Sequence, residues 1–434
     1  MDILPLETLL RIFELACTDG GYTGCSLSQV SKEVRAISSA VRFHSVFLIA
    51  SPRRLRSFIA LFERECNTTQ GHKPHVRHLY VAFPSLQRDN SPDAADAQSF
   101  IQSLRRPPSG SPPPVASYPS PTTELLKLLE LPDNAPELAE ERPKPAEAPD
   151  PTASAEYFDA ARTLFRLVGP DLVSLMVQCE FGDGAPDLPI IERPFPRLRE
   201  VTVVGIADPS AMLTKGADGT PPLFPAATHL YFAPHGVDIR VAFWSKHAPR
   251  VTHLAMSRAN GGNYIDQIAP AIGVPGEYVG YLRERSRRAE MYWDPDGALE
   301  PLQPPKLPNP PPPRTYPSVR CLLMVPAHPQ RYMCGNGYRQ YFADLAVVRD
   351  AGTKAWERGV TAIVADAPEP SDWPHRGDCA RARENWVLRV EGKAGCWVAF
   401  AAEPDLPPGI VAQDEGGSSH DSDVDATDSS LHLG

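Results

Sequence analysis

The sequence is poor in the features that mark a membrane protein or a secreted protein. It contains no apolar run of the ~18 residues that a membrane-spanning helix needs. Its eight cysteines include no C-x-x-C pair, which is typical of reduced thiols and not of a disulfide framework or a zinc site. The N-terminus lacks a charged stretch followed by an apolar one, the pattern of a secretory signal. We therefore expect a protein of the cytoplasm and/or nucleus, with no membrane partner.

Motifs of catalysis and cofactor binding are missing as well. There is no G-x-S-x-G elbow and no H-E-x-x-H pair. Gly335-Asn336-Gly337 is followed by neither a third glycine nor the lysine of a P-loop, and the twelve histidines show no metal-ligand spacing with cysteine. We therefore predict that the chain is not an enzyme and has no catalytic residue, no metal and no cofactor.

Positive charge is also scarce. The net charge is −10, and the segment from Glu403 onward holds eight acidic residues without a lysine or arginine, so the rest of the chain is nearly neutral. A nucleic-acid surface needs clustered positive charge. We expect no nucleic-acid partner, and we expect residues 403–434 to be a disordered acidic tail.

Proline, by contrast, is abundant and unevenly distributed. Of the 49 prolines, 22 lie in 103–121, 131–151 and 299–317, which we interpret as disordered inserts or spacers. Hydrophobic residues make up 42% of the chain, enough to build a substantial core in the remainder.

The first 50 residues carry apolar side chains at helical spacing. Pro5 is suited to the first turn of a helix, and Leu6, Leu9, Leu10 and Phe13 then follow at intervals of three and four. A second amphipathic segment begins after Ser26, and its apolar residues are Leu27, Val30, Val34, Ile37 and Val41. A third apolar run covers 43–49, and a connecting helix is expected in 51–72. A unit this small usually needs a partner to cover its remaining apolar surface.

Several short stretches of this region agree with a known motif in order and approximate spacing. They are Leu4-Pro5-Leu6-Glu7, Leu9-Leu10-Arg11-Ile12-Phe13, Val30-Ser31-Lys32, Arg35, and Phe43 with Val46 and Leu48. On these residues, positions 1–50 resemble an F-box of the fungal type. The resemblance implies a three-helix module that binds the Skp-type adaptor of an SCF (cullin-RING) ubiquitin ligase, while the rest of the chain recruits a protein substrate. By position it implies eight residues that face the adaptor or the helix packed on it: Leu4, Pro5, Leu9, Ile12, Phe13, Val30, Val34 and Ile37.

A recurring frame follows in the middle of the chain. Six segments read x-Pro-x-φ-x-x-φ-x-φ, where φ is apolar: 73–81, 169–177, 195–203, 224–232, 248–256 and 316–324. Each ends in a short alternating strand, and 359–365 fits the frame without its proline. Several frames are roughly 24 to 29 residues apart, within the range of about 20–29 for leucine-rich repeats.

The frame predicts an α/β fold in which parallel strands build a curved solenoid. We expect an irregular leucine-rich-repeat-like region over 73–402, which resembles the region that follows many fungal F-boxes. Tryptophans near the C-terminus (Trp356, Trp373, Trp386 and Trp397) would close its open end. A nonrepetitive α/β domain, whose strands happen to follow proline, is the alternative.

The sixth residue of the frame, which lies directly before its second apolar position, offers candidates for substrate binding. His78, His229 and His253 occupy this position in three frames. Because alternate residues of a strand point to opposite faces, we expect these histidines to lie on an exposed face. Solvent exposure alone explains polar residues there equally well.

Together these observations favour a non-catalytic substrate-recognition adaptor of an SCF-type ligase. Its partners would be the Skp-type adaptor, cullin through that adaptor, and an unknown protein substrate. The alternative is a repeat-protein interaction scaffold that is not coupled to ubiquitylation, its N-terminal helices packing on their own domain.

Overall fold

The computed structural model describes residues 4–68, 73–83, 151–179, 190–206, 208–214, 220–234, 239–258, 264–291, 302–306, 308, 312–327, 336–365 and 374–398. Three predicted segments lie outside these residues: the insert 103–121, the insert 131–151 except its last residue, and the acidic tail 403–434. The proline-rich segment 299–317 is described only in part.

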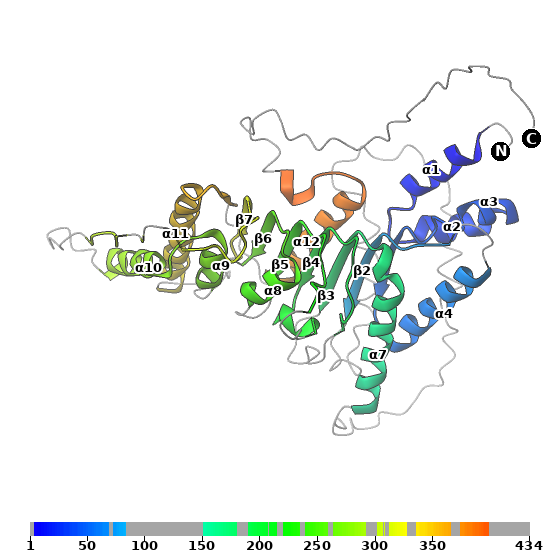
Figure 1. Cartoon of the computed structure of the whole chain (residues 1–434), viewed down its shortest axis with the longest axis horizontal. Helices are drawn as coiled ribbons and strands as arrows, with labels where there is room; N and C mark the ends of the chain where they lie inside the picture. The colour runs from blue at the N-terminus through cyan, green and yellow to red at the C-terminus, as the bar shows by residue number, and fades with distance from the viewer. Residues whose placement is uncertain are drawn as a thin grey trace, which may run out of the picture.

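Eight strands form one parallel sheet, and they follow one another across it in chain order (Figure 1). The strands are β1 (Ser45–Ile49), β2 (His78–Phe83), β3 (Ser174–Cys179), β4 (Glu200–Val204), β5 (His229–Ala233), β6 (His253–Ser257), β7 (Cys321–Val325) and β8 (Thr361–Val364). The register is regular, since the first residues of β2 to β8 are paired in one row across the sheet.

The described residues also form ten α-helices. They are α1 (Leu6–Ala16), α2 (Tyr22–Val30), α3 (Lys32–Ser38), α4 (Pro52–Thr68), α7 (Pro151–Val168), α8 (Val241–His247), α9 (Tyr264–Ile272), α10 (Gly276–Met291), α11 (Asn336–Trp356) and α12 (Pro374–Val390). Short 3-10 helices lie at Gly169–Asp171, Pro209–Met212 and Gly395–Trp397.

The strand positions expected from the proline frame are confirmed. Each of β2 to β7 begins four residues after the proline of its frame. The proline is the second residue of a tight turn, a position that its fixed φ favours; in the β4 frame, the Leu198 N–H donates to the Phe195 carbonyl at 3.3 Å. The residue before the strand then accepts two bonds from the next frame, as the Val173 carbonyl does from Arg199 and Glu200 at 2.8 and 3.2 Å. Proline therefore positions the strand from a turn and is not its first residue.

The predicted leucine-rich-repeat-like solenoid over 73–402 is wrong. The structure is a single eight-stranded parallel sheet in an α/β arrangement. In a solenoid each repeat contacts only its neighbours, whereas α12, close to the C-terminus, returns to pack on β3, β4 and β5. Its Arg389 pairs with Glu200, which lies 189 positions earlier in the chain.

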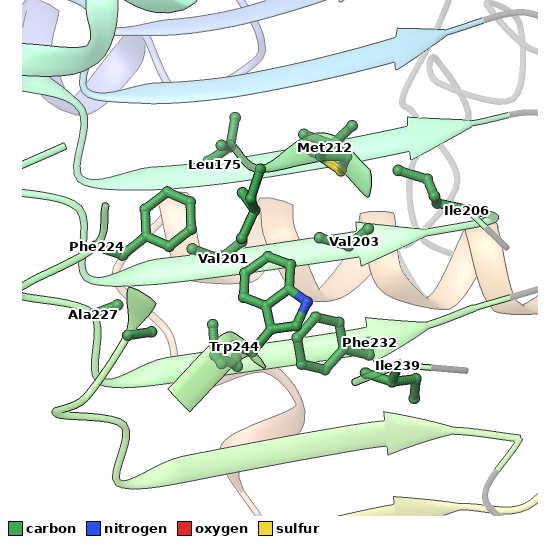
Figure 2. Packing of buried hydrophobic residues seen from close by; sticks show 14 of the residues in the cluster. Leu175, Val201, Val203, Ile206, Met212, Phe224, Ala227, Phe232, Ile239 and Trp244 are labelled. Carbon is green, nitrogen blue, oxygen red and sulfur yellow. The ribbon is translucent and has the colours of Figure 1, made fainter. Parts of the chain in front are cut away.

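One face of the sheet, here called the helical face, is covered by the segments that connect successive strands. It carries apolar side chains at alternate strand positions: Leu79, Val81, Leu175, Val177, Val201, Val203, Leu230, Phe232, Leu254, Met256, Leu322 and Met324. Figure 2 shows part of this layer, in which the Trp244 indole from α8 lies among strand residues. Its ring stacks on Phe224 at 5.8 Å and meets Phe232 edge-on at 4.9 Å. These contacts hold α8 against the sheet.

The opposite face, here called the α12 face, is covered by α12 and the 3-10 helix after it (Figure 1). Its strand residues are more mixed, with His78, Tyr80, Ser174, Met176, Glu200, Thr202, His229, Tyr231, His253, Ala255, Cys321 and Leu323. Trp386 and Trp397 supply most of the apolar cover. The expectation that the tryptophans close the end of a solenoid is therefore wrong: these two lie over the sheet, Trp356 is exposed, and Trp373 is outside the described residues.

Replacing Trp244 by alanine is expected to lower the free energy of unfolding by about 3–5 kcal/mol, because the indole is fully buried between two aromatic rings. Urea denaturation followed by circular dichroism measures this change. Phe342→Ala is the matched control, since that ring is 45% exposed, and it should change the free energy of unfolding by less than about 0.5 kcal/mol. Equal effects of the two changes would contradict this description of the core.

Candidate docking surface on the N-terminal helices

The first three helices pack around a small core of their own. Phe13 of α1 and Val34 of α3 are buried together with Ala40 and Val41. Leu10, Leu27 and Ile37 are partly buried against the same cluster, and Leu9 is buried as well. Of the eight residues implied by the resemblance, Leu9, Phe13 and Val34 therefore serve helix packing, and Ile37 is half-buried.

The remaining four, Leu4, Pro5, Ile12 and Val30, are exposed. They belong to a larger group that we call the N-terminal apolar surface: Leu4, Leu6, Ile12, Leu15, Tyr22 and Val30, each between 44% and 65% exposed. Only nine large apolar side chains are this exposed in the described part of the chain, and six of them lie here. Leu6, Leu15 and Tyr22 were not among the expected site residues, although the apolar pattern of α1 already includes the first two.

The N-terminal apolar surface exists because α1 is apolar on more than one side. Leu9 and Phe13 face the core, whereas Ile12 and Leu15 point away from it. A helix that packs only on its own domain needs a single apolar stripe. The second apolar side of α1 therefore has no function within the described fold.

The second amphipathic segment is two helices, and not the single one expected. Ser31 separates α2 from α3 and caps α3, its Oγ accepting from the Val34 N–H at 3.0 Å. Ser26, after which the segment was expected to begin, lies inside α2. The third apolar run contains β1, which pairs with β2. Three short helices occur in many folds, so their presence does not by itself identify an F-box.

The helices are fixed to the sheet through polar and backbone contacts. The Phe47 N–H of β1 donates to the Gly20 carbonyl at 3.0 Å, and Arg77 pairs with Glu14 of α1 at 2.8 Å. Partial burial opposes ionisation of Glu14, but Arg11 and Arg77 outweigh it and hold its pKa below the usual value. Gly24 is required for close approach, since a Cβ there would lie 2.2 Å from the Arg42 carbonyl oxygen. The N-terminal apolar surface is thus held in one orientation.

The three candidate histidines lie in one row on the α12 face. His78 pairs in register with Ser174, and His229 pairs in register with His253. These histidines were expected on an exposed face, but all three are half-buried. Burial lowers the pKa of His78 and of His229 to about 3 each and also lowers that of His253. The rings of His229 and His253 stack at 4.3 Å, and Trp397 meets both edge-on at 5.1 and 5.4 Å.

The cavity beside this row is too small for a substrate. It measures about 20 Å³ and is lined by Glu200, His229, Trp386, Arg389 and Trp397 among others; a single water needs about this much room. Arg389 Nε donates to both carboxylate oxygens of Glu200 at 2.9 and 3.0 Å. The hydrogen bond and charge of Glu200 raise the pKa of Arg389, although burial opposes this. This ion pair joins α12 to β4 beside the row of histidines, and the role of these histidines in substrate binding stays a prediction.

Two other kinds of site were sought in the residues that the structure describes. No group of three or more His, Cys, Asp or Glu side chains there is arranged to hold a metal ion. Nor does any helix among them have the length and apolar character needed to cross a bilayer.

Comparisons with known proteins do not assign the chain to a family. No protein-family model, no curated protein and no solved structure matches it.

Acidification is expected to destabilise the fold through the buried histidines of the α12 face. The pKa of His229 is lowered from 6.5 to about 3 in the folded chain, so the unfolded chain binds more protons between these values. Its contribution to stability is complete above pH 6.5 and falls as the pH drops toward 3, by up to about 1.4 kcal/mol per pH unit.

Urea denaturation at a series of pH values between 7 and 4 measures this dependence. His229→Phe keeps the stacked ring and removes the titrating group, so its free energy of unfolding should fall less steeply with decreasing pH. Tyr231→Phe, on the same face, changes a side chain that does not titrate in this range and should keep the steeper dependence. Equal slopes for wild type and His229→Phe would contradict the burial of a neutral imidazole.

Proposed function

We propose that this chain is the substrate-recognition adaptor of an SCF-type (cullin-RING) ubiquitin ligase. Its N-terminal helices bind the Skp-type adaptor subunit, and the rest of the chain holds a protein substrate. Two things support the proposal: the resemblance of residues 1–50 to an F-box, and the concentration of exposed apolar side chains on α1 and α2.

The N-terminal apolar surface is the single observation that carries the proposal. Large apolar side chains that stay exposed together mark a surface that another protein covers. Completing the burial of a half-exposed Leu, Ile or Val stabilises a complex by roughly 1 kcal/mol per side chain. Five such side chains, Leu4 before α1 and four on α1 and α2, would together with Tyr22 supply the apolar centre of a specific interface.

The division between buried and exposed residues agrees with a docking module. Leu9, Phe13 and Val34 hold the helices together, and this packing positions Ile12 and Val30 at the outer surface. Leu4 and Pro5 precede α1 and are exposed beside the same helix. The proposal therefore assigns adaptor contact to Leu4, Pro5, Leu6, Ile12, Leu15, Tyr22 and Val30, and internal packing to the buried residues.

The mechanism is proximity. An adaptor that holds a substrate beside the ubiquitin carrier raises the local concentration of the two reactants and restricts their orientation. No acid, base, nucleophile, metal or cofactor is required of this chain, and the proposal assigns none to it.

The double variant Ile12→Ser with Val30→Ser tests the proposal. Both side chains are exposed, so we expect the chain to fold normally and to bind a purified Skp-type adaptor at least about tenfold more weakly. Isothermal titration calorimetry measures the affinity, and circular dichroism verifies the fold.

The matched control is Phe342→Ser, which removes an exposed apolar side chain from α11 and should leave adaptor binding unchanged. The proposal would be contradicted if the wild-type chain failed to bind the adaptor, or if the double variant bound it as tightly as the wild type does. The N-terminal apolar surface would then belong to an interaction protein that is not coupled to ubiquitylation.

A further inference from the structure

The two edge strands of the sheet, β1 and β8, differ in the hydrogen bonds made by their outer sides. At the β1 edge, the turn between α1 and α2 covers the outer side of the strand, since the Gly20 carbonyl accepts from the Phe47 N–H and the Gly20 N–H donates to Ser45 Oγ at 2.8 Å. At the β8 edge, no residue in the described ranges pairs with the outer side of the strand. Among the described residues, the β1 edge is therefore covered and the β8 edge is not.

The backbone groups that β8 presents outward can be identified from the pairing. The N–H groups of Thr361 and Ala365 donate to the carbonyls of Arg320 and Met324 on the β7 side, at 2.7 and 2.9 Å. Because successive amides of a strand alternate between its two sides, the amides of Ala362 and Val364 face away from the sheet. They form a short row of donors and acceptors that an added strand would satisfy.

The composition of β8 does not protect this edge. Exposed edge strands are usually blocked by lysine, proline or a bulge. β8 reads Thr-Ala-Ile-Val, without a charge or a proline, and all four residues are half-buried. The shortness of β8 limits the pairing to one short segment of another chain.

A groove runs alongside this edge. It has a volume of about 410 Å³ and lies between α11 and β8, with Arg349, Gly352, Thr353, Trp356, Ala362 and Val364 as its lining. Gly352 faces the strand, since a Cβ there would lie at ordinary contact distance, 3.5 Å, from the Ala362 Cβ. The Trp356 indole is 63% exposed at the end of α11. A groove between a helix and an edge strand is the arrangement in which extended peptides are bound by strand addition.

The charge of the groove indicates one further feature of the ligand. The exposed Arg349 has no ion pair with any residue that the structure describes. The neighbouring carboxylates are already neutralised, since Asp350 pairs with Arg285 and Glu357 pairs with Lys354. A guanidinium in this setting favours a carboxylate on the ligand.

We propose that β8 and α11 form a binding site for an extended peptide segment of a protein partner. The segment adds to the sheet beside β8, packs an apolar side chain against Trp356 and Val364, and brings an acidic residue to Arg349. A helical ligand would leave the outward amides of Ala362 and Val364 without partners, which is why the ligand is extended. The site lies at the opposite edge of the sheet from the N-terminal helices (Figure 1) and does not depend on the proposed adaptor role.

A phage-displayed library of random peptides, selected on the full chain, tests the proposal. We expect the selected peptides to share an apolar residue and an acidic residue a few positions apart. Their affinity, measured by isothermal titration calorimetry, should fall at least about tenfold in Trp356→Ser and in Arg349→Glu. Both side chains are exposed, so these variants should keep the melting temperature of the wild type. Phe342→Ser, on the same helix but outside the groove, is the matched control and should bind as the wild type does.

Strand addition itself is tested on the peptide, which avoids disturbing the protein. Methylation of the backbone nitrogens that face β8 should abolish binding, because it removes donors of the added ladder. Four outcomes would overturn the proposal. The first is that no selected peptide depends on Trp356 and Arg349 for binding, and the second is that binding survives methylation at every position. The third is that the chain associates with itself and that Trp356→Ser abolishes this association. The fourth is that hydrogen exchange shows the Ala362 and Val364 amides to be protected already in the free chain.

Discussion

In some parallel sheets each strand is added beside the previous one, always in the same direction. Right-handed crossovers then place every connecting segment on the same face of the sheet. Here eight strands follow one another in chain order, and the connecting helices that the structure describes pack on the helical face and build one continuous core there. The cover of the other face comes from α12 and the 3-10 helix after it, which follow the last strand.

This arrangement explains why the α12 face combines apolar and polar side chains. Tyr80 donates to Gln178, and Tyr231 and Ser257 share a hydrogen bond of 2.6 Å, so these four buried side chains are satisfied within the face. The Arg389–Glu200 pair then fastens α12 at a point where the sheet would otherwise bury a carboxylate alone. A buried charge is tolerated only with such a partner. The face is consequently a packed layer with a cavity of about 20 Å³.

The two proposed binding surfaces occupy the two ends of the sheet. At the β1 edge the helices close the strand and leave their own apolar side chains outward. At the β8 edge the strand has no further partner within the described ranges and lies beside an exposed tryptophan. Both follow from an open sheet, which unlike a barrel has two edges that must be covered or used.

Short-range patterns in the sequence determined the strand starts, because a turn proline and alternating apolar residues act within a few positions of each strand. They also determined α1 and its wide apolar surface. Tertiary structure decided which face α12 covers, that His78, His229 and His253 are half-buried in one row, and that the strands form one sheet and not a solenoid. The physical reason is distance along the chain: the contact between Arg389 and Glu200 joins residues 189 positions apart, and no local periodicity records such a pair. Burial of a polar side chain is likewise a property of the element packed on it, so the same alternation predicts an exposed face or a covered one equally well.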